Sequence, residues 1–295
     1  MKESPLTINF EKQWKEGMHD WHGMMPERMI NDKLEEAFWA QSMQKKTYKQ
    51  TDAHAKQIYE KMKRHIPAKA SCIEIGPGWG NYTFSLQEDV EKLTLVDGSE
   101  SVLHYLKQYF VDDEGVQLVH AKWEDAILEP HDIVVGVNCY YRMYEMNETL
   151  LKMNALAKKR AIIGLTTGPI QPHYEVLHQK YGYKIKYPRR DYIQIVNMLY
   201  QLGIYADCEM LKLERTYRYE NEEALYAAQS KKILDSQFDI AHVKASLVPF
   251  IKEIQGKIEY RHTFYAAIIS WEPVKLGGYD DNLELNKHAA SSAYL

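Results

Sequence analysis

The sequence has few cysteines, no long apolar run and no strong excess of one charge. Cys72, Cys139 and Cys208 are the three cysteines in 295 residues, and they lie far apart. This spacing excludes a disulfide framework and a paired-cysteine metal site, and it favours buried, reduced thiols. No run of about 18 apolar residues and no signal-peptide core occurs, so we expect a cytoplasmic protein that does not span a membrane.

The charge balance is close to neutral. The formal net charge is −4 at pH 7, with 45% hydrophobic and 26% charged residues. These values are typical of a soluble globular protein and exclude overall disorder or a fibre. They show no broad electrostatic footprint for a polyanion, so nucleic acid is not the expected partner. The oligomeric state cannot be read from the sequence, and a homodimer stays open.

Short apolar runs alternate with helix-like segments after residue 67. The expected strands span residues 71–75, 92–96, 116–121, 131–137, 160–165 and 261–271, and residues 205–214 are also strand-like. Because these runs are unbroken rather than alternating with polar residues, they indicate a mainly parallel sheet covered on both faces. The fold class is therefore an open α/β layer fold.

The regions around this pattern predict further parts of the molecule. Residues 1–66 are polar, aromatic-rich and helix-like, which predicts an N-terminal helical cap or lid with a helix capped by Thr51. The other expected parts are a ligand-binding domain at 67–275, insertions at 168–190 and 216–258 that form a substrate lid, and a loosely held polar tail at 276–295.

Residues 72–86 read CIEIGPGWGNYTFSL, so Gly76, Gly78 and Gly80 directly follow the first expected strand. Glycine inside an element costs about 0.5–1 kcal/mol relative to alanine, so three together predict a sharp turn or a closely approaching ligand. In an open parallel sheet, ligands bind beyond the carboxyl ends of the strands, where the topology switches. Asp97 closes the neighbouring run LTLV, where a carboxylate can accept both hydroxyls of an unphosphorylated ribose.

Two classes of cofactor fit a glycine turn followed by an acidic residue that binds the ribose hydroxyls. A nicotinamide dinucleotide requires the pattern G-x-G-x-x-G, but position 81 is Asn and the glycines follow G-x-G-x-G. Glu74 would also lie unfavourably beside a pyrophosphate, and favourably beside a ligand that carries an ammonium and a sulfonium. The acid therefore favours S-adenosylmethionine, and a nicotinamide-dependent oxidoreductase is the less favoured alternative.

With these motifs the sequence resembles the class I S-adenosylmethionine-dependent methyltransferases of small-molecule type. Their motif acid-x-G-x-G-x-G matches residues 74–80, and their ribose acid matches Asp97 in LTLVDGS. Their adenine-contacting turn matches AKWEDA, and the motif after the next strand falls on Asn138. The resemblance implies a Rossmann-like three-layer α/β/α sandwich with a mostly parallel seven-stranded sheet, an N-terminal helical cap, and insertions after strands 5 and 6.

The resemblance also implies the chemistry and the residues that carry it. The cofactor would be S-adenosylmethionine, S-adenosylhomocysteine would be the product, and an O, N or S atom of a small molecule would accept the methyl group by in-line displacement. The implied cofactor-binding residues are Glu74, Gly76, Gly78, Gly80, Asp97, Gly98, Trp123, Glu124 and Asn138. The acceptor-side candidates are Tyr140, Tyr141, Arg142, His173 and Tyr174. A general base is needed only for a hydroxyl or a protonated amine.

The sequence departs from the family in two places. The common L-x-P-G-G turn before the fifth strand is replaced by ALAKKRAIIG, and the motif after the fourth strand is NCYY. Two alternatives to a methyltransferase of small molecules stay open: methylation of a nucleic acid or a protein, and a non-catalytic module that binds the same cofactor.

Several of these features also have ordinary structural explanations. Asp97 could cap the helix that begins near Ser99. The basic side chains of Lys180, Lys184, Lys186, Arg189 and Arg190 could bind nucleic acid, hold an acidic small molecule or face water. His19 and His22 have ligand-like spacing but no evident acidic or cysteine partner, so no metal is expected.

Overall fold

The computed structural model describes residues 8–45, 51–110 and 114–276. The chain divides into two compact units: a sheet unit of residues 1–165, 190–209 and 267–295, and an insert unit of residues 166–189 and 210–266. The expected insertions overlap the insert unit, and their role as a substrate lid stays a prediction. The expected tail at 276–295 lies outside the described residues, except for residue 276.

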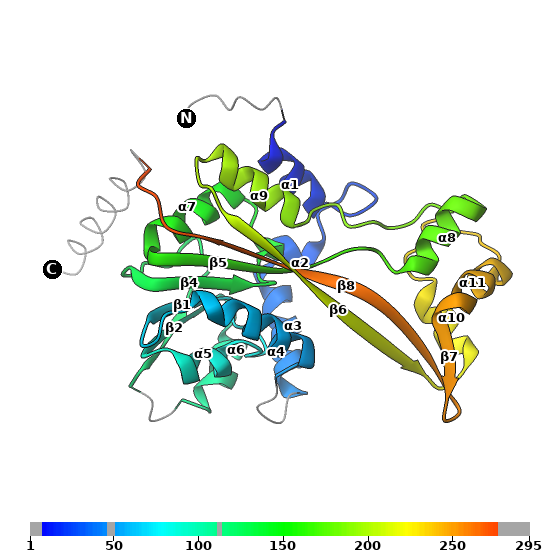
Figure 1. The fold of residues 1–295 in the computed structure, drawn as a ribbon, viewed down its shortest axis with the longest axis horizontal. Helices are drawn as coiled ribbons and strands as arrows, with labels where there is room; N and C mark the ends of the chain where they lie inside the picture. Colours follow the sequence, from blue (N-terminus) through cyan, green and yellow to red (C-terminus); the bar gives the residue numbers. More distant parts are fainter. Residues whose placement is uncertain (1–7, 46–50, 111–113, 277–295) are drawn as a thin grey trace. The chain divides into compact units, whose positions relative to one another are not determined.

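The described strands form one sheet with the order β3-β2-β1-β4-β5-β8-β6, and β7 pairs with β8 (Figure 1). Their bounds are β1 Ser71–Ile75, β2 Lys92–Asp97, β3 Val116–His120, β4 His131–Val137, β5 Ala157–Thr167, β6 Asp207–Tyr219, β7 Ile251–Ile254 and β8 Lys257–Trp271. Strands β1 to β5 pair in parallel, as expected from their unbroken apolar runs. The mostly parallel α/β fold is thus confirmed.

The sheet has eight strands, so the expected number of seven is wrong. The additional strand is β7, which pairs antiparallel with the start of β8 through Ile254 and Lys257. Gln255 and Gly256 form the two-residue turn between them, with φ angles of 50° and 71°. Two consecutive residues with positive φ make a turn that matches the twist of a hairpin. Gln is an uncommon residue there, so residues 255–256 carry no clear hairpin signal.

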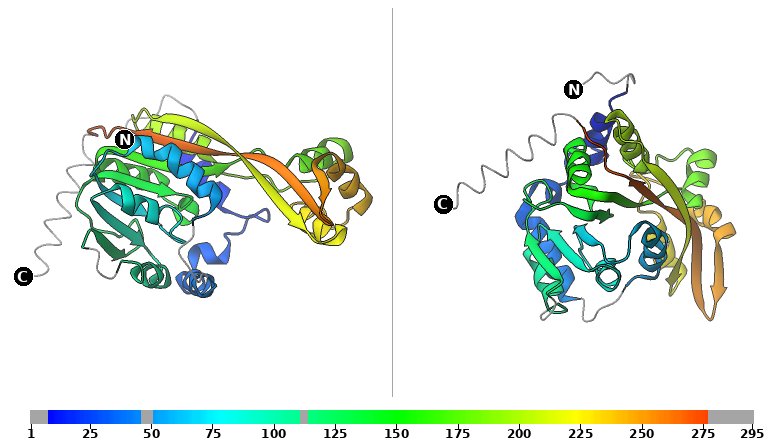
Figure 2. Two further views of the ribbon diagram at one scale, coloured as in Figure 1. Left: turned by 60° about the horizontal axis from the view of Figure 1, so that its bottom comes forward. Right: turned by 60° about the vertical axis from the view of Figure 1, so that its left-hand side comes forward.

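Helices cover both faces of the sheet. Figures 1 and 2 show α4, α5 and α6 on one face and α1, α7 and α9 on the other. Their bounds are α4 Ala53–Met62, α5 Thr83–Asp89, α6 Glu100–Lys107, α1 Phe10–Met18, α7 Met146–Leu156 and α9 Tyr192–Gln201. The main core lies between these layers and includes Ile73, Val134 and Ile163, all fully buried. The strand ends are therefore held by a packed, rigid interior.

The N-terminal residues form α1, α2 Glu27–Ile30, α3 Asp32–Gln44, α4 and the 3₁₀ turn η1 Lys63–His65 within the sheet unit. Trp14 of α1 is buried and donates from Nε1 to the Met143 carbonyl oxygen at 2.8 Å. The expected cap of α4 at Thr51 is wrong. Asp52 caps it, because its carboxylate accepts from the backbone N–H groups of His54 and Ala55.

The insert unit has its own apolar core. Its helices are α8 Pro172–Tyr181, α10 Glu222–Gln229 and α11 Ile240–Leu247, with the 3₁₀ turn η3 Val248–Phe250. Tyr174, Leu225, Val243 and Tyr260 are buried together between these helices and the strands. Among the residues that the structure describes, no helix is long and apolar enough to cross a membrane.

The three cysteines are free thiols. Cys72 is buried in β1, where burial raises the pKa of its thiol, and Cys139 is half-buried. Cys208 is exposed on β6, so the expectation that all three are buried is wrong at this position. Residue 208 lies on the strand at the end of the sheet order, where one side of the strand has no neighbour.

Candidate functional site

A cavity of about 590 Å³ lies at the carboxyl ends of β1, β2 and β4 within the sheet unit. Strand β1 pairs with β2 on one side and with β4 on the other, so the chain direction across the sheet switches at this point. The turns after β1, β2, β3 and β4 all contribute to the lining. The predicted residues that line it are Gly76, Gly78, Asp97, Gly98, Trp123, Glu124, Asn138, Tyr141 and Arg142.

The glycine turn after β1 has left-handed backbone at Gly76 and Gly78, with φ angles of 60° and 49°. A Cβ atom on Gly76 would lie 2.6 Å from Cβ of Cys139, and one on Gly78 would lie 3.0 Å from the Trp39 ring. The glycines are thus required by backbone conformation and by close packing within the protein. The sharp turn, one of the two expected reasons for these glycines, is therefore present, and the close approach of a ligand stays a prediction. Gly80 does not line the cavity.

Asp97 ends β2 and faces the glycine turn. Its Oδ1 accepts from the Ser99 N–H at 2.8 Å, and its Oδ2 accepts from the Gly78 N–H at 3.4 Å. Burial raises the pKa of this carboxyl to about 6. The negative charges of Glu36 and Glu35 act in the same direction, and the hydrogen bonds from the Ser99 and Gly78 N–H groups oppose it. The helix α6 is capped by Ser99, whose hydroxyl accepts from the Val102 N–H, so Asp97 is not the cap.

Glu74 lies in the middle of β1 and is almost fully buried, with 3% of its surface exposed. Its Oε2 atom has no hydrogen-bond partner in the described part of the chain. Burial raises the pKa of Glu74 to about 8, and the Asp97 carboxylate contributes in the same direction. The side chain does not line the cavity, although the next residue, Ile75, does.

The turn after β3 carries Trp123 and Glu124. Trp123 is buried, and its Nε1 has no partner among the residues described. Lys152 of α7 fixes this turn, because its ammonium donates to the carbonyl oxygens of Trp123, of Glu124 at 3.1 Å and of Ala126 at 2.6 Å. Sequence reasoning missed Lys152. A lysine within an apolar helix face was its only signal.

Of the predicted residues in the segment after β4, Asn138, Tyr141 and Arg142 line the cavity and Tyr140 does not. Asn138 has a φ of 55°, a conformation that asparagine tolerates better than most residues, and it donates its N–H to the Gly164 carbonyl at 2.9 Å. Tyr140 is buried away from the cavity lining and donates to the Gly136 carbonyl at 3.0 Å. Tyr141 and Arg142 line the cavity instead.

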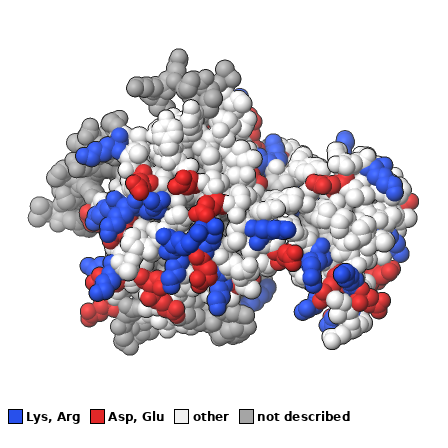
Figure 3. Space-filling view, viewed as in Figure 1, with Lys and Arg blue, Asp and Glu red and all other residues white. Residues whose placement is uncertain are grey.

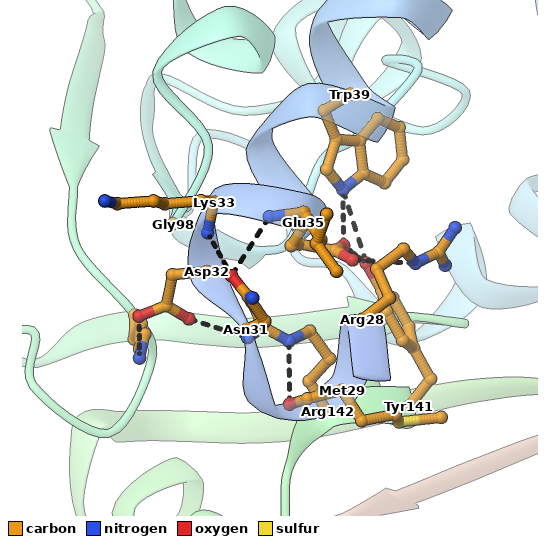
Figure 4. A network of polar contacts seen from close by, with 12 residues as sticks. Arg28, Met29, Asn31, Asp32, Lys33, Glu35, Trp39, Gly98, Tyr141 and Arg142 are labelled. Atoms are coloured by element: carbon orange, nitrogen blue, oxygen red, sulfur yellow. Dashed lines mark hydrogen bonds and ion pairs between the residues drawn. The ribbon is translucent and has the colours of Figure 1, made fainter. Parts of the chain in front are cut away.

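The N-terminal part of α3 supplies a wall of the cavity that sequence reasoning did not find. Asp32 pairs with Lys122 at 2.8 Å and with Arg142 at 2.6 Å, and these cations lower its pKa. Glu35 accepts hydrogen bonds from Trp39 Nε1 and from the Tyr141 hydroxyl (Figure 4). These contacts join α3 to the turns after β3 and β4, which lie far away in sequence.

His173 and Tyr174 do not join this group of residues. They are buried in the interior of the insert unit, with 0% and 1% of their surfaces exposed. His173 Nδ1 lies 2.8 Å from the Tyr260 hydroxyl, and its Nε2 lies 3.1 Å from the Gln229 carbonyl oxygen. Burial lowers the pKa of His173 to about 4. Both ring nitrogens are thus satisfied by the unit's own atoms.

The predicted basic group is also divided. Arg190 belongs to the sheet unit, where it donates to the Tyr141 carbonyl at 2.8 Å and packs over the Trp14 ring. Burial lowers its pKa to about 10. The other four residues, Lys180, Lys184, Lys186 and Arg189, belong to the insert unit. On the face drawn in Figure 3, positive and negative side chains are interspersed.

Within residues 8–45, 51–110 and 114–276, no three His, Cys, Asp or Glu side chains are arranged to hold a metal ion. His19 Nδ1 donates to the Lys15 carbonyl oxygen, 3.1 Å away.

No family model and no curated protein matches this sequence. Its structure, however, is similar to solved structures. One is a provisionally named methyltransferase from Bacillus halodurans, with 13% identity, a TM-score of 0.50, and coverage of 76% of this chain and 98% of that one. The YcgJ protein from Bacillus subtilis has 12% identity, a TM-score of 0.51, and coverage of 76% and 100%.

A third similar structure is the magnesium protoporphyrin IX methyltransferase from Synechocystis with bound S-adenosylhomocysteine. It has 11% identity, a TM-score of 0.44, and coverage of 89% of this chain and 94% of that one. At such identities, similarity of structure concerns the fold. The comparisons therefore confirm that the chain has the Rossmann-like fold that class I methyltransferases share.

Proposed function

We propose that this protein is an S-adenosylmethionine-dependent methyltransferase that acts on a small molecule. The observation that carries the proposal is a pair of carboxyl groups at the switch point of the sheet, the buried Glu74 and the half-buried Asp97. Neither forms an ion pair with a Lys, Arg or His in the described part of the chain. A buried carboxylate without a cation is costly, so the site favours a positively charged ligand.

The residues present fit this cofactor. The 590 Å³ cavity lies within the range of about 300–1,000 Å³ that is usual for small-molecule sites. Asp97 would accept the ribose hydroxyls, and the buried Trp123 and exposed Glu124 would hold the adenine. Glu74 lies behind the lining, next to Ile75, and the negative charge that it takes up on ionisation would favour the ammonium of the methionine part. The same carboxyl would oppose a pyrophosphate, which makes a nicotinamide dinucleotide the poorer candidate.

S-adenosylmethionine supplies an activated methyl group on its sulfonium, so the protein has little covalent chemistry to perform. The remaining work is to exclude water and to hold the acceptor atom in line with the methyl, about 3–3.5 Å away. Tyr141 and Arg142 on the lining, together with Glu35 and Trp39 of α3, are the groups available to position the acceptor. Tyr140, His173 and Tyr174 are satisfied within the protein interior and are not included in this proposal.

A small-molecule acceptor is supported by the surroundings of the cavity. The wall provided by α3 is tied to the turns after β3 and β4 by Asp32, which limits the opening. The interspersed charges in Figure 3 offer no basic surface for a nucleic acid on that face.

Calorimetric titration of S-adenosylmethionine and S-adenosylhomocysteine tests the cofactor assignment. We expect both to bind the wild type and to bind Asp97→Ala about 100-fold more weakly, because hydrogen bonds to a charged group contribute about 1.5–3 kcal/mol each. Glu272→Gln is the matched control, since this carboxyl is 79% exposed and pairs with Arg160. Equal affinity in wild type and Asp97→Ala would refute the ribose assignment.

Transfer itself requires a second measurement. Formation of S-adenosylhomocysteine is followed with a panel of amines, thiols, phenols and carboxylates as acceptors. Turnover with any of them supports the small-molecule enzyme. Tight cofactor binding without turnover, including with RNA, DNA and protein acceptors, would favour the non-catalytic binding module instead.

A further inference from the structure

Trp39 of α3 lies against the glycine turn on the wall of the cavity. Its Cη2 atom is 3.0 Å from the position that a Cβ atom on Gly78 would occupy, and its ring is among the lining groups. The ring also meets Trp79 edge to face, with 5.6 Å between centroids and 63° between planes. The indole is thus fixed against the backbone that follows β1.

A buried carboxylate orients this indole. Trp39 Nε1 donates to Glu35 Oε1 at 2.8 Å, and only 5% of the Glu35 surface is exposed. Glu35 is itself held by Arg28 Nε, 2.8 Å from its Oε2, and by the Tyr141 hydroxyl (Figure 4). A hydrogen bond from an indole N–H to a carboxylate is charge-assisted, and it leaves the ring face more electron-rich.

The cavity around this ring lacks positive charge near the glycine turn. Glu74 and Asp97 have no cationic partner among the described residues, and Glu35 has Arg28 alone. The two cations that do line the cavity, Lys122 and Arg142, both pair with Asp32. An electron-rich aromatic face near carboxyl groups that lack a cationic partner is a favourable place for an organic cation.

We propose that Trp39, oriented by Glu35, is a specificity-determining residue that recognises the positive charge of the sulfonium. The inference rests on the proposed function, since it concerns the same cofactor. The inference goes beyond the proposed function by assigning a preference between two ligands. The charged S-adenosylmethionine binds more tightly than S-adenosylhomocysteine, whose sulfur is neutral. The preference would favour replacement of the product by a new cofactor molecule after each transfer.

The test compares dissociation constants for three ligands by calorimetry. They are S-adenosylmethionine, S-adenosylhomocysteine, and an analogue with an ammonium in place of the methylsulfonium. Cation–π contacts contribute about 0.5–2 kcal/mol, so Trp39→Leu should reduce the preference for both cationic ligands over S-adenosylhomocysteine by about 3- to 30-fold. Trp39→Phe keeps an aromatic face and should retain most of the preference.

Two further variants separate charge recognition from packing. Leu34→Ala is the control on the same helix, because Leu34 is 40% exposed and is not among the lining residues. It should leave the preference unchanged. Glu35→Gln keeps the size of the side chain but removes its charge, so it should reduce the preference by a smaller factor than Trp39→Leu. Circular dichroism and thermal unfolding establish that each variant is folded.

The outcomes are distinguishable from failure of the proposed function. If Trp39→Leu and Trp39→Phe weaken all three ligands by the same factor, or leave the ratios unchanged, Trp39 is a packing residue and this inference is overturned. If none of the ligands binds the wild type, the proposed function fails and the inference fails with it. A reduced preference in Trp39→Leu that is rescued by Trp39→Phe supports it.

Discussion

The sheet unit and the insert unit both bury titratable groups, but they treat them differently. In the sheet unit, Glu74 has an oxygen with no partner and Asp97 accepts only backbone N–H groups at the edge of a cavity. In the insert unit, His173 has a partner on each ring nitrogen. Both arrangements shift a pKa by burial. Of these three groups, Glu74 alone has an oxygen without a partner, so its hydrogen bonding, more than its pKa shift, indicates that something from outside the chain completes the site. The contrast applies to these groups and not to the whole units, because Gln229 Oε1 and His262 Nε2 of the insert unit also lack a partner among the described residues.

Replacing His173 by alanine should have the largest effect of the changes predicted here, and the effect should be on the free energy of unfolding. The change removes a fully buried ring and leaves the Tyr260 hydroxyl without its partner, which should cost about 3–5 kcal/mol of unfolding free energy. Chemical denaturation, followed by hydrogen exchange in residues 166–189 and 210–266, measures it.

Gln179→Ala, an exposed position on the same helix, is the control and should change stability by no more than about 0.5 kcal/mol. S-adenosylhomocysteine affinity should remain that of the wild type in His173→Ala. If His173→Ala abolished binding while the protein stayed folded, the distinction between the two units would be wrong.

Acid should destabilise the insert unit through the same residue. The pKa of His173 is about 4 in the folded protein, against about 6.5 for a free histidine. The unfolded chain therefore binds the extra proton first, and the stability that neutral His173 contributes is complete above pH 6.5 and lost as the pH falls towards 4. The loss should approach about 3 kcal/mol.

Unfolding measured at several pH values checks this dependence. Other groups also titrate in this range, so the informative quantity is the difference between wild type and His173→Gln, in which the residue cannot take up a proton. Parallel pH profiles for the two proteins would contradict a neutral, buried His173.

Much of the sheet and of its binding edge could be predicted because the signals are local. The unbroken apolar runs gave the parallel strands, and parallel strands bring their carboxyl ends to one edge. That geometry alone places Gly78, Asp97, Trp123 and Asn138 around one cavity. The binding roles of these residues stay predictions, but their proximity follows from short sequence patterns and the rules of α/β topology.

The missed features depend on contacts between distant segments. No local pattern shows that α3 crosses the strand ends, because its position is fixed by contacts such as Glu36 with the Ser101 N–H at 3.0 Å. Likewise, nothing near Lys152 indicates that it supports the turn after β3. His173 and Tyr174 looked like polar lid residues in sequence, whereas folding of the insert unit satisfies and buries them.

Cofactor affinity should depend on pH through Asp97, and this effect should be smaller than the losses of stability expected at His173. The free carboxyl has a pKa of about 6, and accepting ribose hydroxyls requires the ionised form. Below pH 6 a proton must leave this carboxyl before binding, so Asp97 alone should lower the affinity for S-adenosylhomocysteine about tenfold between pH 7 and pH 5. Asp97→Asn should bind weakly and should lack this contribution, whereas the pH dependence that proton release from Glu74 produces should remain. A wild-type affinity that is constant from pH 7 to 5 would show that Asp97 does not bind the ligand as a carboxylate.

Binding should also change the protonation of Glu74. With a pKa of about 8, this carboxyl is mostly protonated in the free protein at pH 7. A ligand ammonium nearby favours the ionised form, so binding should release up to about 0.9 proton at pH 7. Calorimetry in two buffers with different ionisation enthalpies measures this number. Glu74→Gln should release almost none, whereas Glu272→Gln should behave as the wild type. If the wild type released no proton, the ligand ammonium would not be bound near Glu74. Glu74 would then be a structural residue of the core, as His173 is in the insert unit.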